Sequence, residues 1–152
     1  DEQTRLTVNV TDEYYNPVDG GETINITEVK GGGGNYVQVS GYNDPSGGSV
    51  SLNISAPYTG ETKFDYDPSV NYVGTVTIKA EEDGTGISVS KSFTVNPGDL
   101  NNVRIVSADS LTGVDEFQDT VGTSHTLITE LLDTYGNHIE AAGGGDVEVT
   151  YS

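Results

Sequence analysis

Short runs in which apolar and polar residues alternate recur along the whole chain, and this feature limits the fold more than any other. Alternation with a period of two places every second side chain on one face of a β-strand, and no window of the sequence has the periodicity of an amphipathic helix. Clusters of Gly, Pro, Asn and Asp separate the runs and predict tight turns. The clearest runs are Leu6–Val10, Ile24–Ile26, Val50–Ile54, Val76–Ala80 and Val103–Ile105. Short strands joined by turns predict an all-β protein, an antiparallel β-sandwich.

An internal repeat indicates how these strands are organised. The segment Leu6–Val18 aligns without a gap with Leu127–Ile139, and the turn formers Asn96-Pro97-Gly98-Asp99 lie between the two copies. We therefore expect residues 1–98 to form one sandwich module and residues 99–152 to supply the opening strands of a second, which is incomplete in this chain. The first module begins at the counterpart of Leu127, so it lacks a counterpart of the strand around Val103–Ile105.

The repeated segment resembles the turn signature of invasin- and intimin-type bacterial Ig-like repeats. In that signature a strand ends in Asp, and a Gly-Asn pair and a hydrophobic residue follow. Asp133–Ile139 fits the pattern, and Asp12–Val18 fits it except that Tyr15 stands at the Gly position. Because a Tyr side chain resists a positive φ, we expect a different turn type in the first module. The resemblance implies Ig-like modules in tandem, as in the rigid stalks of cell-surface adhesins.

Candidate site residues are few. Asp12 and Asp133 are expected to cap their turns by accepting backbone N–H groups two residues on, together with Asn16 and Asn137. Ligation of a metal is the alternative for these acidic residues. Asp12 and Asp99 are weak candidates for calcium near the module junction, and no other cofactor is expected. The alternative interpretation of the acidic residues is a solvated face.

The charge balance excludes one class of partner. The chain carries 24 acidic and 6 basic residues, a formal net charge of −18. Nucleic acid binding needs clustered Lys and Arg, so we expect no nucleic acid partner. The acidic residues are scattered, which favours a hydrated surface suited to high salt over a cation-binding patch. Together with the resemblance, this composition is similar to that of secreted or surface proteins of halophilic archaea.

The sequence gives little support for catalysis or for membrane insertion. Ser124 and His125 are adjacent on an expected strand, so their side chains should point to opposite faces and cannot form a nucleophile–base pair. We expect no catalytic residues, and no apolar run approaches the roughly 20 residues of a membrane-spanning helix. Three Asn-x-Ser/Thr sequons, at Asn9, Asn25 and Asn53, are glycosylation candidates that should point to solvent, although such tripeptides also arise by chance.

These observations favour a non-catalytic, extracellular structural or adhesive Ig-like module of a cell-surface protein from a halophile. Its expected partners are neighbouring Ig-like modules or like subunits. The alternative is a subunit of an extracellular, pilus-like filament or of a virion surface, assembled by strand complementation. That alternative follows from the incomplete modules, because a partial sandwich exposes an apolar face and open strand edges.

Overall fold

The computed structural model describes residues 3–54, 58–107, 122 and 127–140 of the 152-residue chain. The chain divides into two compact units, Asp1–Asn96 and Pro97–Ser152. Every element within the described residues is a β-strand, and all the strand pairs are antiparallel. The predicted all-β class is confirmed.

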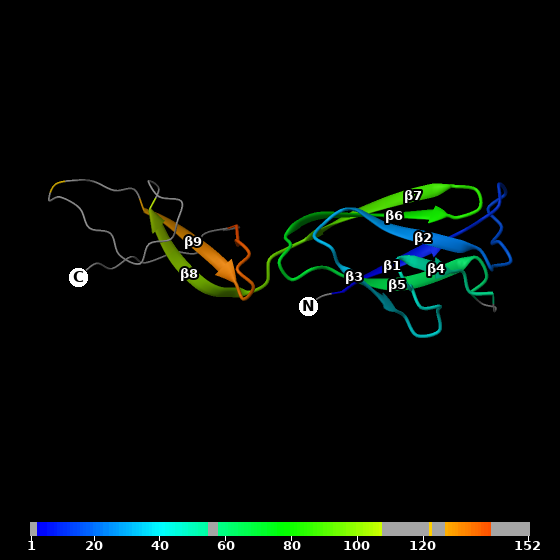
Figure 1. Ribbon diagram of the computed structural model, residues 1–152, viewed down its shortest axis with the longest axis horizontal. Coiled ribbons are helices and arrows are strands. Elements are labelled where there is room, and N and C mark those ends of the chain that lie inside the picture. The colour runs from blue at the N-terminus through cyan, green and yellow to red at the C-terminus, as the bar shows by residue number, and fades with distance from the viewer. Residues whose placement is uncertain (1–2, 55–57, 108–121, 123–126, 141–152) are drawn as a thin grey trace. The chain divides into compact units, whose positions relative to one another are not determined.

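Unit 1 contains two antiparallel sheets (Figure 1). The first has the order β1-β5-β3 and consists of β1 (Thr4–Asn9), β5 (Glu61–Asp67) and β3 (Asn35–Gln38). The second has the order β4-β2-β6-β7 and consists of β4 (Ser49–Ser51), β2 (Thr23–Lys30), β6 (Gly74–Glu82) and β7 (Ser88–Val95). The strands β1 and β7 are therefore outer strands, each at one edge of its sheet.

Both sheets contribute their apolar faces to one core. The buried cluster consists of Ile24, Ile26, Val50, Leu52, Phe64, Tyr66, Val76, Ile78 and Ala80. In β2 and β6 these residues alternate with less buried ones, as the period-two pattern predicts. The burial of this alternating set between the sheets is the main stabilising contribution to the sandwich of unit 1.

The central strand β5 is a strand that the apolar pattern does not predict. Its sequence is Glu-Thr-Lys-Phe-Asp-Tyr-Asp, in which only the two aromatic residues are apolar. Nevertheless Thr62, Phe64 and Tyr66 alternate and are almost completely buried. Aromatic and Thr residues are as common in strands as aliphatic β-branched residues are. This run therefore forms a strand with a partly polar inner face.

Unit 2 contains one sheet in its described part. β8 (Leu100–Ser107) pairs with β9 (Leu127–Asp133), and Ile105 lies opposite Thr129. Val103 and Ile105 remain 46% and 40% exposed. The strand expected near Val147–Val149 and the Ser124–His125 pair lie outside the described residues. β9 is the repeat counterpart of β1, and these two counterpart strands have different neighbours in the two units.

Candidate functional site

The two copies of the repeated turn have the same backbone hydrogen bonds. In unit 1, the Oδ1 atom of Asp12 accepts hydrogen bonds from the backbone N of Tyr14 at 2.8 Å and of Asn16 at 2.9 Å, and the amide of Asn16 donates to Oδ2 at 2.9 Å. The backbone N of Asp12 donates to the carbonyl of Asn16 at 2.9 Å. The carboxylate thus closes an Asx-turn and ties both ends of the loop together.

The turn in unit 2 repeats this network around Asp133. Its Oδ1 accepts from the backbone N of Tyr135 at 2.8 Å and of Asn137 at 2.9 Å, and Oδ2 accepts from the Asn137 amide at 2.9 Å. Oδ2 also accepts from the backbone N of Gly98 at 3.0 Å. Burial alone would raise the pKa of Asp133, but the four donors lower it to about 2.

The two turns differ in one expected respect, and the expectation was wrong. Tyr15 adopts a φ of 66°, and its counterpart Gly136 has a φ of 84°. The first turn therefore keeps the conformation of the second despite its Tyr. The hydrogen bonds to Asp12 hold the loop in this conformation, and their combined stabilisation outweighs the steric cost of a left-handed non-Gly residue.

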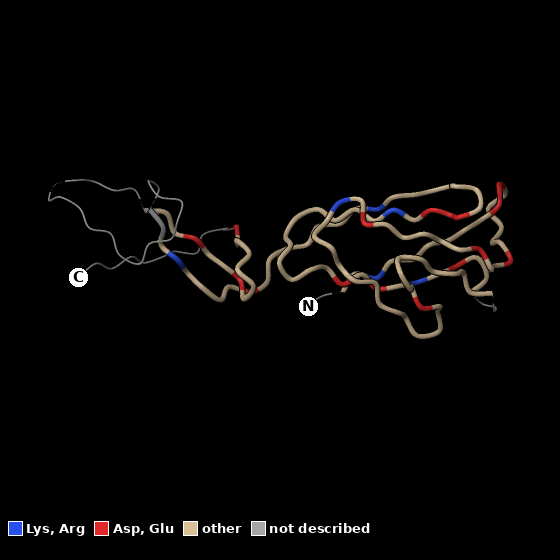
Figure 2. Tube along the Cα trace, viewed as in Figure 1, with Lys and Arg blue, Asp and Glu red and all other residues tan. Residues whose placement is uncertain are grey.

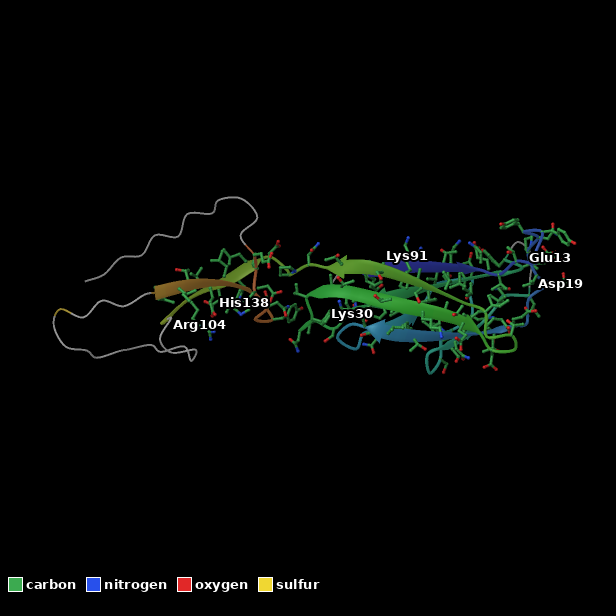
Figure 3. The ribbon with its side chains drawn as sticks, turned by 90° about the horizontal axis from the view of Figure 1, so that it is seen from above. Glu13, Asp19, Lys30, Lys91, Arg104 and His138 are labelled. Carbon is green, nitrogen blue, oxygen red and sulfur yellow. The ribbon has the colours of Figure 1, made fainter. Side chains whose placement is uncertain are left out.

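The hydrogen bonds within the turn satisfy the carboxylate of Asp12 without a metal ion. Its donors lower the pKa of Asp12, chiefly through the side-chain and backbone groups of Asn16, so the group is an anion already satisfied by the turn. The other calcium candidate, Asp99, is exposed. In the described part of the chain, no group of three or more His, Asp or Glu residues could hold a metal ion. Figure 3 shows Glu13, which is part of this turn, and Asp19, which follows it, at one end of unit 1.

The three sequon residues lie in unlike environments. Asn25 is half-buried, its Nδ2 donates to Asp83 at 2.9 Å, and its Oδ1 accepts from Ser49 at 2.8 Å. Asn53 is also half-buried, and its Nδ2 donates to the carbonyl of Gly41 at 2.9 Å. Asn9 is exposed. Of the three side chains that were expected to point freely to solvent, the geometry thus leaves Asn9 as the most accessible.

An apolar groove lies beside the outer strand β1. It has a volume of about 540 Å³, and its lining comes from β1 and the segment after it, from β2 and β6, and from the start of β7 and the turn before it. The apolar lining residues are Val8, Val10, Val18, Ile24, Ala80, Ile87 and Val89. Ile87 and Val89 are 74% and 65% exposed. The groove therefore joins the open edge of one sheet to the open edge of the other.

One polar atom in this groove lacks a partner. Within the described residues, the Oε2 atom of Glu22 is buried and accepts no hydrogen bond. A buried carboxylate oxygen without a donor is energetically costly, so a donor from outside the unit would be stabilising at this position.

Sequence reasoning located the turns but not the groove. The turn residues form a short contiguous motif, whereas the groove combines residues from both sheets. The available sequence signal was the repeat, because β9 pairs with β8, whereas its counterpart β1 pairs only with β5 within the described residues.

A second network that the sequence did not indicate joins Glu28 to Tyr66. The hydroxyl of Tyr66 donates to Oε2 of Glu28 at 2.5 Å, and the backbone N atoms of Gly33 and Gly34 donate to the same carboxylate. Burial raises the pKa of Tyr66, and the adjacent carboxylate raises it further. This network connects the two sheets at the end of β2 and stabilises the loop of glycines that follows.

Comparison with known proteins leaves the family open. The chain matches no protein-family model, no curated protein and no solved structure. Among the described residues, no helix has the length and apolar character needed to cross a bilayer.

Proposed function

We propose that this chain is a non-catalytic structural or adhesive part of an extracellular cell-surface protein, built from tandem Ig-like β-sandwich modules. The observation that carries the proposal is the duplicated turn. Asp12 and Asp133 accept the same hydrogen bonds from equivalent positions, and each turn follows a strand of its own unit. A repeated framework of strands and turns is typical of proteins that use modules as spacers.

The surface charge supports a setting of high ionic strength. The net charge is −18, and four of the six basic side chains already pair with carboxylates: Arg5, Lys63, Lys79 and Arg104. Figure 2 shows acidic residues distributed over both units. Salt screens the repulsion among such charges, so the composition suits a protein exposed to a halophile's surroundings.

Immunolabelling of the source organism tests this proposal. An antibody raised against the chain should label intact cells, and a known cytoplasmic protein, the control, should be labelled only after permeabilisation. If the antibody also requires permeabilisation, the cell-surface assignment is wrong.

A second candidate function is favoured by the open strand edges. A subunit of an extracellular filament or a virion surface needs an edge that can accept a strand from a neighbour, and β1 and β7 offer such edges beside the groove. Negative-stain electron microscopy of native material distinguishes the two functions. Regular fibres support the filament, whereas isolated rods support the stalk.

A further inference from the structure

We propose that the groove beside β1 is a docking site for the β8 strand of a second copy of this chain. This docking deepens the proposed function, because it names the step by which copies of the chain would assemble. In that respect it rests on the proposed function.

The repeat identifies which kind of strand fits the open edge. β1 and β9 are counterparts in the aligned segment, and each ends at the same Asx-turn. β9 has β8 as its antiparallel partner. Within the described residues, β1 pairs only with β5. Equivalent strands have equivalent edges, so a strand of the β8 type suits the free side of β1.

The register of unit 2 then places the incoming side chains. Ile105 lies opposite Thr129 and Val103 opposite Leu131, and in the repeat these two β9 residues correspond to Val8 and Val10. Val8 and Val10 both line the groove. An incoming β8 would therefore direct Ile105 and Val103 into the groove.

The exposure of apolar side chains on β8 and in the groove indicates why docking would be favourable. In unit 2 Val103 and Ile105 stay 46% and 40% exposed, and in unit 1 the groove leaves Ile87 and Val89 largely exposed. Because β8 would use the same edge for β1 as for β9, docking replaces one set of strand hydrogen bonds by another of equal kind. The net gain is the apolar surface that both partners remove from water.

Asp12 would also gain a donor, in place of the one that Asp133 gives up when β8 leaves β9. In unit 2 the backbone N of Gly98, just before β8, donates to Oδ2 of Asp133, whereas Oδ2 of the exposed counterpart Asp12 accepts from Asn16. A docked segment would bring its Gly98 to Asp12 in the same way. Arg104, the one basic residue of β8, alternates with Val103 and Ile105 and would therefore lie on the opposite face of the strand, beside Asn9.

Assembly of this kind is directional. The site on unit 1 differs from the strand on unit 2, so the contact is heterologous and each copy can donate and accept at once. Because two copies with a charge of −18 each repel one another, association should require salt.

Engineered cysteines test the register directly, because the chain contains no cysteine. The repeat places Arg104 of one copy opposite Asn9 of the other. We would mix full-length Asn9→Cys chains with full-length Arg104→Cys chains in molar KCl, under a glutathione buffer. The Cβ atoms of directly opposite residues are close enough for a disulfide, so a cross-linked heterodimer is expected.

Two controls make the result specific. Thr7→Cys is exposed on the same face of β1 but is out of register with Arg104, so mixing it with Arg104→Cys should yield at least about tenfold less heterodimer. Adding Ile87→Lys to the Asn9→Cys chain should abolish the cross-link. Ile87 is largely exposed, so this variant is expected to fold, which circular dichroism would verify.

Equal yields from the two cysteine pairs, or no heterodimer in either dilute or molar salt, would overturn the proposal.

A labelled peptide with the sequence of residues 97–107 provides a second experiment. Competition between the peptide and the cross-link supports the docking site. Binding of the peptide without any cross-linking of whole chains would show that another protein supplies the strand, and the second copy would then be the wrong occupant. Surface labelling of cells is unaffected by any of these results, so the two proposals can fail separately.

Discussion

Tyr15 shows at the scale of one residue how far a motif predicts conformation. The signature located its turn correctly, but the Tyr in place of Gly suggested a different turn type, and the observed φ of 66° contradicts that suggestion. Local propensity was outweighed by the Asx-turn hydrogen bonds, which the motif itself specifies through Asp12 and Asn16. The Tyr at the Gly position therefore does not determine the turn type by itself.

Replacing Tyr15 with Gly should therefore stabilise unit 1. The left-handed conformation costs a non-Gly residue about 1–2 kcal/mol, and the greater freedom of an unfolded Gly offsets part of this, so we expect a net gain of about 0.5–1 kcal/mol. Chemical denaturation measures the change. The neighbouring Glu13→Gly is the control, because Glu13 has no positive φ and should lose stability or stay unchanged. A Tyr15→Gly variant less stable than the parent contradicts the strain argument.

The contact between Glu28 and Tyr66 should make stability depend on pH. Burial raises the pKa of Glu28, but the hydrogen bonds from Tyr66, Gly33 and Gly34 outweigh it, and the net shift is downward from 4.5. A lowered folded-state pKa stabilises the fold above the ordinary carboxyl pKa, and this contribution is lost as the pH falls through the folded-state value.

The Tyr66→Phe variant should remove a large part of that contribution. Because the hydroxyl donates to a charged carboxylate, we expect a loss of about 1.5–3 kcal/mol at neutral pH and a smaller loss in acid, where Glu28 is protonated. Denaturation at neutral and acidic pH measures both. Tyr72→Phe, which loses a hydrogen bond to the carbonyl of Thr75, is the control and should show a cost independent of pH. Equal losses at the two pH values for Tyr66→Phe would rule out the ionic contribution.

At the scale of elements, aliphatic alternation predicted the strands that contain it and failed where other residues fill the core. β2, β6, β8 and β9 lie at predicted runs. β5 was not predicted, because its inward residues are Thr62, Phe64 and Tyr66. Strand pairing could not be predicted from periodicity, since a period of two fixes the face of a side chain but not its neighbouring strand. The groove could therefore not be predicted from the sequence, because it combines residues from both sheets.

Thr62 in β5 offers a test of the packing in the sandwich. Its side chain is completely buried, and Oγ1 has no hydrogen-bond partner among the described residues. Val has the same shape without the hydroxyl, so Thr62→Val should raise the free energy of unfolding by about 1 kcal/mol. Thr75→Val on β6 is the matched control, because Thr75 is exposed and the change should be close to neutral. Thermal denaturation gives both values, and a destabilised Thr62→Val would mean that the hydroxyl has a partner.

At the scale of the whole molecule, the net charge dominates. With 24 acidic and 6 basic residues, repulsion among carboxylates opposes the compact state in dilute buffer. Figure 3 shows Lys30 and Lys91 on the strands of unit 1 and Arg104 on β8. Basic side chains so few in number neutralise the surface only locally.

The melting temperature should therefore rise between dilute buffer and molar KCl. Screening reduces the repulsion over distances greater than about 10 Å already at 0.1 M salt, so the rise should begin at low concentrations. Calorimetry at a series of KCl concentrations measures it, and an equal series of sucrose solutions controls for solvent exclusion from the protein surface. A melting temperature that stays flat or falls in molar salt would contradict adaptation to high salt.

Glycosylation and strand docking compete for one residue. By sequence, Asn9, Asn25 and Asn53 are all glycosylation candidates. The amide nitrogens of Asn25 and Asn53 donate to neighbouring groups within unit 1, so the exposed Asn9 is the more accessible sequon.

Asn9 also lines the groove, so a glycan there would occupy the path of an incoming β8 strand. We therefore predict that native material separates into two populations: chains with a glycan on Asn9 remain unassembled, and chains in assemblies carry an unmodified Asn9. Size fractionation followed by peptide mass spectrometry measures the occupancy in each fraction. Asn25 and Asn53 serve as internal controls, because neither lines the groove and their occupancy should not differ between fractions. Equal occupancy of Asn9 in the assembled and unassembled fractions would show that assembly does not use this edge, and a mass equal to that of the bare chain throughout would show that the source adds no glycan.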